Sequence, residues 1–181
     1  MVVSVGIFSI VMLLATGAYL TIISLDKQTR AQNDLVNSLT FAVDSVARSI
    51  RTGHGYICGG SNVNASEDGQ GNCPSGDVSL YYTDENNRKV AYRLTNTGQL
   101  GRCASNAGDP FVICNSVNAI PLTDPRITIN TITFYVQGVG SGDSTQPGVT
   151  FRINGSLDLG AKYGTRSFTV QTTSTQRLIE L

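Results

Sequence analysis

Three patterns of hydrophobic and polar positions follow one another along the chain. Residues 1–25 carry no charged side chain, and their polar side chains bear only hydroxyl groups. Residues 26–53 repeat apolar side chains at spacings of three and four, which is typical of one face of a helix. Residues 54–181 contain short alternating stretches between clusters of Gly, Asn and Ser. The patterns predict an apolar helix, an amphipathic helix and a strand-rich globular domain.

The apolar run is long enough to cross a bilayer, because a membrane helix needs about 20 mostly apolar residues. A cleaved secretory signal has basic residues before an apolar stretch of roughly 7 to 15 residues. This run has no basic residue before it and is longer, although Ala15, Thr16 and Gly17 resemble a small-residue cleavage site. A membrane segment is therefore favoured, with a cleaved signal as the alternative.

The apolar run continues into the amphipathic stretch without a helix-breaking residue, and Gly53 supplies a stop signal. We therefore expect one helix to about residue 52, a rod of roughly 75 to 80 Å at 1.5 Å per residue. Its first half is apolar all round and belongs in lipid or among identical helices. Its second half is expected to pack on the domain through one stripe of side chains: Leu35, Leu39, Val43, Val46 and Ile50.

Strand signals fill the rest of the chain. Residues 78–82 and 90–94 alternate on either side of an Asp-Glu-Asn-Asn turn and predict a β-hairpin. Further strands are expected at residues 111–114, 127–137, 149–153 and 167–173, and a long loop at residues 53–74. Within residues 127–137, apolar residues occur at odd-numbered and at even-numbered positions, which point to opposite faces of a strand. We therefore expect the helix to cover one face of this strand and loops to cover the other. A helix followed by strands predicts an α+β fold with an antiparallel sheet.

The four cysteines are Cys58, Cys73, Cys103 and Cys114, and none belongs to a Cys-x-x-Cys pair. Their turn-rich surroundings favour disulfides over a zinc site or thiol redox chemistry. Four cysteines allow three pairings, which all remain open, and the local pairs, Cys58 with Cys73 and Cys103 with Cys114, are favoured. Disulfides persist in oxidising compartments, so the domain is expected outside the cytoplasm.

Composition and candidate chemistry point away from catalysis. The chain has 13 basic and 13 acidic residues, so it offers no basic field for nucleic acid. His54 is the one histidine and therefore lacks a histidine partner for a catalytic or metal site. Asp143 and Asp158 lie near glycine-rich turns but match no calcium-loop spacing. We expect no enzymatic activity, no cofactor and no metal.

Several stretches resemble one family. "MVVSVGIFSIVMLLATGAYL" is similar to the hydrophobic stretch that follows the Phe-Thr-Leu-Ile-Glu start of type IV pilins and of the pseudopilins of type II secretion. "KVAYRLTNTGQLGRC", "PLTDPRITINTITFYV", "QPGVTFRINGSL" and "FTVQTTSTQR" resemble strand blocks of J-type minor pseudopilins. The resemblance covers most of the chain.

The resemblance implies a subunit that waits in the membrane and then enters a filament, with its apolar helix in the core and its domain outward. Its implied partners are other pilin or pseudopilin subunits, the inner or cytoplasmic membrane, and a secreted cargo or surface ligand. The expected assembly residues are Val5, Ile7, Phe8, Val11, Leu14 and Gly17.

The family's processing glycine, basic leader and early glutamate are not seen before "MVVSVG". We expect Met1 not to be the natural start of the protein, the alternative being a subunit that lacks the glutamate. A second class also stays open, namely a single-pass anchored domain that binds an extracellular ligand without polymerising.

Overall fold

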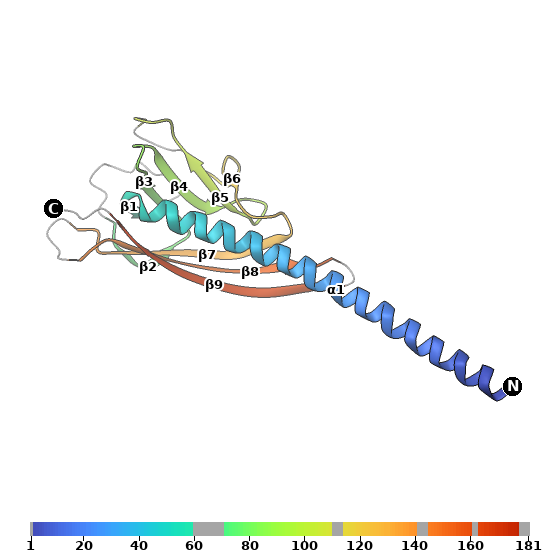
Figure 1. Ribbon diagram of the computed structural model, residues 1–181. Coiled ribbons are helices and arrows are strands. Elements are labelled where there is room, and N and C mark those ends of the chain that lie inside the picture. Colours follow the sequence, from blue (N-terminus) through green and yellow to red (C-terminus); the bar gives the residue numbers. More distant parts are fainter. Residues whose placement is uncertain (1, 60–70, 110–113, 141–144, 161–162, 178–181) are drawn as a thin grey trace.

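The computed structural model describes residues 2–59, 71–109, 114–140, 145–160 and 163–177. They form one long helix packed on two antiparallel sheets (Figure 1), so the α+β class expected from the sequence is confirmed. In chain order the elements are α1 (Val2–Arg51), β1 (His54–Cys58), β2 (Cys73–Asp77), β3 (Ser79–Thr83), β4 (Lys89–Leu94), β5 (Leu100–Ala104), β6 (Ile120–Pro121), β7 (Ile127–Gln137), β8 (Gly148–Asp158) and β9 (Thr165–Thr175).

Helix α1 runs without interruption through both of its predicted halves and ends close to the expected position. Its 50 residues correspond to about 75 Å. The last turn closes through backbone hydrogen bonds from Thr52 N–H to the Arg48 carbonyl and from Gly53 N–H to the Ile50 carbonyl. Arg48 and Arg51 lie in this last turn, where positive charge favours the carbonyl end of a helix.

The described strands form two sheets, whereas the sequence indicated one. The five-stranded sheet has the order β1-β3-β4-β5-β6, and the four-stranded sheet has the order β2-β7-β8-β9. The predicted hairpin is present as β3 and β4, with Leu80 opposite Tyr92. Asp84 shapes its turn, because its carboxylate accepts hydrogen bonds from the N–H groups of Asn86 and Arg88 and from the Arg88 guanidinium. The turn signal in the sequence therefore acts through one buried carboxylate.

The boundaries of several other elements differ from the prediction. Residues 53–74 are not a plain loop, because β1 and β2 form its two ends. Strands β8 and β9 are longer than expected, and they pair in register over 11 consecutive positions. Strands β5 and β6 were not predicted. The strand expected at residues 111–114 lies mostly outside the described residues, and Cys114 itself is not in a strand.

A β-bulge explains why β7 carries apolar residues at both parities. Ile129 pairs with Gly155 and Thr131 with Asn154, so Asn130 is an extra residue in the ladder. The extra residue shifts the alternation by one position, so odd-numbered residues before the bulge and even-numbered residues after it point to the same face. The residues buried on that face are Ile127, Ile129, Ile132, Phe134 and Val136. The expectation of two covered apolar faces was therefore wrong for this strand.

One hydrophobic core joins the helix to both sheets. Helix α1 and both sheets contribute side chains to this core. Among the described residues, the five-stranded sheet contributes Leu80, Val90 and Tyr92, and the four-stranded sheet contributes Phe134 and Phe151. A smaller cluster on the opposite face of the five-stranded sheet contains Tyr81, Ala91, Cys103, Cys114 and Ala119. Because α1 supplies side chains to a core that both sheets share, the position of the helix on the domain is determined by packing on both.

Candidate functional site: the exposed half of the helix

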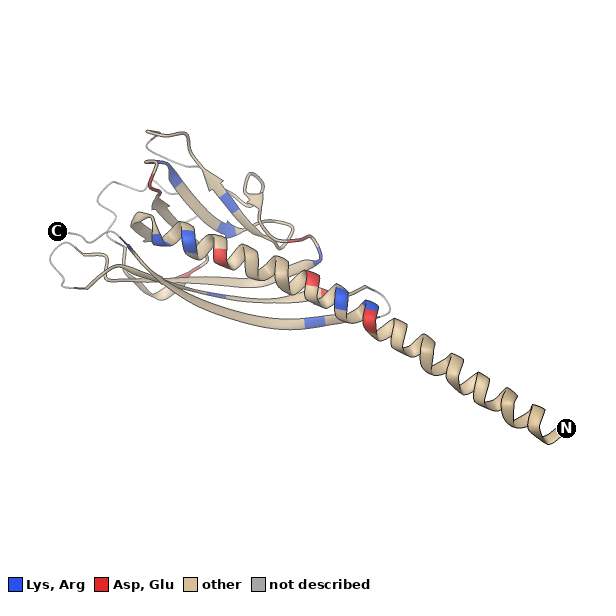
Figure 2. Cartoon of the chain, in the orientation of Figure 1, with Lys and Arg blue, Asp and Glu red and all other residues tan. Residues whose placement is uncertain are grey.

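The first half of α1 extends away from the domain and is covered by no other part of the chain that the structure describes (Figure 1). Every side chain from Val2 to Ile22 is exposed. Figure 2 shows that charged residues begin only where the helix reaches the domain. By length and composition, α1 is able to cross a membrane, and among the described residues it is the one helix that meets this test.

The predicted assembly residues surround the helix instead of forming one stripe. Successive residues of an α-helix turn by about 100°, which places Val5 and Ile7 on nearly opposite sides. All six side chains are exposed: Val5, Ile7, Phe8, Val11, Leu14 and Gly17. The candidate site is therefore a whole apolar cylinder, which suits burial in lipid or among several other helices.

Three hydroxyl groups of this half form hydrogen bonds within the helix itself. Ser9 Oγ donates to the Val5 carbonyl at 2.9 Å, Thr16 Oγ1 to the Met12 carbonyl at 2.8 Å, and Thr21 Oγ1 to the Gly17 carbonyl at 3.0 Å. An unpaired hydroxyl in an apolar medium costs several kcal/mol, whereas a bond to the preceding turn removes most of that cost. These hydroxyls consequently do not prevent the cylinder from being surrounded by apolar groups.

The second half of α1 is fixed to the domain by its apolar stripe. The structure buries all of the predicted packing residues: Leu35, Leu39, Val43, Val46 and Ile50. Ala42 is buried beside them and was not predicted. Each fully buried Leu, Ile or Val contributes about 1.5–3 kcal/mol. The helix is therefore held by a core contact much stronger than a flexible linker would provide.

Tyrosine hydroxyls reinforce this attachment. The buried Tyr56 hydroxyl lies 2.6 Å from both the Ile50 and the Gly53 carbonyl oxygens, at the carbonyl end of the helix. Tyr82 and Ser49 share a hydrogen bond of 2.5 Å between their hydroxyl oxygens. Burial raises the pKa of Tyr82 well above its usual value, so this phenol stays protonated. These contacts orient the end of the rod as well as hold it.

Gly53 permits the close approach of the chain to Tyr82 just after the helix ends. A Cβ atom at this position would overlap the Tyr82 ring, lying 2.7 Å from its Cε2 atom. The sequence singled out Gly53 as a helix stop signal. The structure adds that the absence of a side chain lets the tyrosine ring pack against the backbone.

The domain also contacts the helix at the end of the exposed half. The Tyr163 hydroxyl donates a hydrogen bond of 3.0 Å to the Ser24 carbonyl, although the two residues lie 139 positions apart. Two residues later, Asp26 and Arg30 form an exposed ion pair with an Nε–Oδ2 distance of 2.9 Å. Sequence reasoning missed Tyr163 as a helix contact, because no local pattern links the turn after β8 to the helix.

The structure pairs Cys58 with Cys73 and Cys103 with Cys114, which are the local pairs that the sequence favoured. The first disulfide joins β1 to β2 and thus connects the two sheets. Its Cα–Cα distance is 6.3 Å, and that of the second is 5.6 Å. None of the four cysteines belongs to α1, so both disulfides act on the domain.

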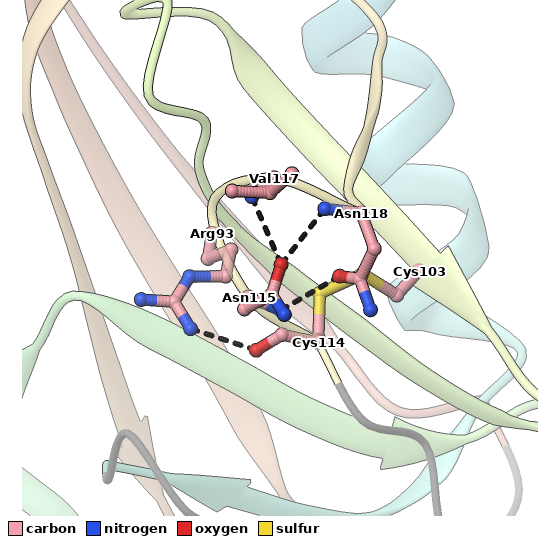
Figure 3. The surroundings of a disulfide bond; sticks show 6 residues. All are labelled: Arg93, Cys103, Cys114, Asn115, Val117 and Asn118. Atoms are coloured by element: carbon pink, nitrogen blue, oxygen red, sulfur yellow. Dashed lines mark hydrogen bonds between the residues drawn. A yellow bond between two sulfur atoms is a disulfide. The ribbon is translucent and has the colours of Figure 1, made fainter.

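The second disulfide fastens a loop onto the outer face of the five-stranded sheet (Figure 3). The loop is closed by Asn115, whose side-chain oxygen accepts from the N–H groups of Val117 and Asn118 at 2.9 and 2.8 Å. Arg93 from β4 donates to the Cys114 carbonyl at 2.7 Å. The loop therefore covers the small cluster around Tyr81.

The other candidate residues do not gather into a site. His54 is exposed at the start of β1. Asp158 accepts a hydrogen bond from Gly160 N–H, as expected for an ordinary turn residue. Asp143 lies outside the described residues.

The comparisons with known proteins identify no relative. No family model matches the chain, and neither a curated protein nor a solved structure is significantly similar to it.

Proposed function

We propose that this chain is a structural subunit without enzymatic activity, a minor pilin or pseudopilin, which assembles into a filament through the exposed half of α1. The observation that supports this proposal is the difference between the two halves of one uninterrupted helix. One half is apolar on every side and exposed, and the other is fixed in the core of the domain.

The rigidity of the connection favours assembly over simple anchoring. A single-pass anchor works equally well through a flexible linker, whereas a subunit of an ordered filament must hold its domain in one orientation relative to the packed helices. Here the core contacts of Leu35 and Ile50 and the hydroxyl contact of Tyr56 fix that orientation. This geometry is what repeated packing of identical rods requires.

In this proposal α1 first spans the inner or cytoplasmic membrane, and the domain lies on the exoplasmic side. The two disulfides support that side, because they persist in oxidising compartments. The proposed partners are other subunits of the same class, together with a secreted cargo or surface ligand bound by the domain. No cofactor is required.

The test places one charge in the exposed half and measures incorporation into filaments in cells that produce the protein. Val11→Asp puts a carboxylate near the middle of the apolar cylinder, where a charge costs about 2.5–3.5 kcal/mol on insertion scales. We expect wild-type chain in the sheared, sedimentable filament fraction, and loss of Val11→Asp and of Leu14→Asp from that fraction.

Asn37→Asp is the matched control, because it adds the same charge to an exposed position on the half of α1 that lies on the domain. We expect Asn37→Asp to enter filaments as the wild type does. If the wild type itself remains in the membrane fraction without filaments, the proposal is wrong and the anchored binding domain becomes the better description. Normal incorporation of Val11→Asp would also contradict it.

A further inference from the structure

Residues 163–166, called here the β8–β9 turn, lie at the end of the exposed half of α1. Hydrogen bonds of 2.9 Å from Gly164 N–H to the Gly160 carbonyl and 3.0 Å from Leu159 N–H to the Gly164 carbonyl join this turn to the residues that follow β8. Both glycines have positive φ angles, +88° and +70°. From this turn the Tyr163 hydroxyl reaches the Ser24 carbonyl at 3.0 Å. Figure 1 shows that the end of the four-stranded sheet next to this turn is the part of the domain nearest to the exposed half of α1.

The position of this contact along the helix corresponds to the edge of a bilayer. The first charged side chains after the apolar run are those of Asp26 and Lys27, and charged groups avoid the hydrocarbon core of a bilayer. When α1 spans the bilayer, the edge of the hydrocarbon therefore lies close to residue 25, about 1.5 Å along the helix from Ser24. The Tyr163 hydroxyl is hydrogen-bonded at that level.

The side chains near the contact suit the lipid headgroup region. Tyrosine concentrates at membrane interfaces because it has an apolar ring and a polar hydroxyl. Tyr163 is half-buried, and Arg166, three residues further on, is exposed at the start of β9. On the helix, Lys27 follows Ser24 by three residues and is also exposed. Within the described part of the chain, neither Lys27 nor Arg166 takes part in an ion pair, so both are able to approach lipid phosphates.

We propose that the β8–β9 turn is a membrane-contacting surface, on which Tyr163 lies at the level of the lipid headgroups and Arg166 faces their phosphates. The domain then rests on the bilayer by this end before assembly. This inference depends on the membrane insertion of α1 proposed above. It adds a second contact with lipid, made by a part of the chain about 140 residues away in sequence.

The chain contains no tryptophan, so a single introduced tryptophan reports its own depth. We would place the full chain in phosphatidylcholine vesicles whose acyl chains carry bromine either close to the headgroup or near the bilayer centre, since bromine quenches nearby tryptophan. Three variants place the tryptophan at three different depths relative to the bilayer. Tyr19→Trp lies about 8 Å deeper along α1 than Ser24, Tyr163→Trp lies at the proposed interface, and Phe41→Trp lies on an exposed part of α1 about 26 Å beyond Ser24.

We expect Tyr163→Trp to lose fluorescence with shallow bromine more than with deep bromine, Tyr19→Trp to be quenched by deep bromine, and Phe41→Trp to be quenched by neither. Thr165→Trp, an exposed position beside the turn, repeats the test without altering the contact with Ser24, and we expect shallow quenching there too. The near-ultraviolet circular dichroism of the buried tyrosines checks that each variant is folded.

The outcomes separate this inference from the proposed function. If Tyr19→Trp is quenched while Tyr163→Trp and Thr165→Trp are not, α1 spans the bilayer but the turn does not touch it, and the inference is wrong. Quenching of Phe41→Trp as strong as that of Tyr163→Trp would mean that the domain lies flat on the membrane, which also contradicts it. Absence of quenching at Tyr19→Trp would overturn membrane insertion and the inference together.

Discussion

The two halves of α1 should respond differently to the same substitution. Val46 is 0% exposed in the core, whereas Val11 is 56% exposed. Replacing Val46 with alanine removes two buried carbon groups at about 0.8 kcal/mol each and leaves a cavity, for a total of about 2–2.5 kcal/mol. Val11→Ala removes the same groups from a position that no part of the domain covers, and we expect a change of at most about 0.5 kcal/mol.

The measurement is urea and thermal unfolding of the full chain in detergent micelles. The near-ultraviolet circular dichroism of Tyr56, Tyr82 and Tyr92, whose neighbouring ring centroids lie 5.9 and 6.0 Å apart, reports the packed domain directly. For a chain of this size, 1 kcal/mol corresponds to about 2–4 °C, so Val46→Ala should lower the Tm by about 4–10 °C. Equal losses in both variants, or no loss in Val46→Ala, would refute the division of the helix into an anchored half and a free half.

Three further perturbations test the domain. Tyr56→Phe removes the hydroxyl that two backbone carbonyls share at the end of α1, and we expect a loss of about 1–3 kcal/mol in the same urea titration. Burial alone would raise the pKa of Asp84, but the hydrogen bonds from Arg88 and Asn86 lower it below the usual value of an aspartate. The stabilisation from Asp84 is therefore present above the pKa of the unfolded state and is lost as the pH falls through the lower folded-state pKa, so Asp84→Asn should cost about 1 kcal/mol at pH 7 and converge with the wild type in acid. Replacing both Cys103 and Cys114 by serine removes the disulfide that links residues 11 positions apart, and should lower the free energy of unfolding by about 3 kcal/mol. Because the substituted pair has no disulfide left, a reducing agent should cause no further loss at these two positions.

The sequence was sufficient where one local pattern determines the structure. The stripe from Leu35 to Ile50 predicted both the helix and the face that it buries, because a 3.6-residue period has one structural interpretation over that length. The β3–β4 hairpin followed from alternation on either side of the turn at Asp84. The same local reasoning favoured the two disulfide pairs.

Features that depend on the tertiary structure were missed. Strand β2 has no strand pattern, and it fits because Gly76 lies closely against the side chains of Thr133 and Tyr135 on β7. The bulge at Asn130 is visible only from the pairing of β7 with β8. The contact of Tyr163 with Ser24 joins two segments that no sequence pattern relates. This last contact is the part of the candidate site that only the fold reveals.

The disulfide between Cys58 and Cys73 also sets how far the domain extends under load. Because it bridges the two sheets, the 15-residue separation between its cysteines cannot unravel when the chain is pulled from its ends. At about 3.3–3.6 Å per residue, that segment represents about 50 Å of contour length. The intact disulfide already spans 6.3 Å between the two Cα atoms, so stretching single molecules should give a fully extended chain about 45 Å longer once this bond is reduced. If the chain assembles into a filament as proposed, oxidation of this one pair limits how far each subunit extends under tension.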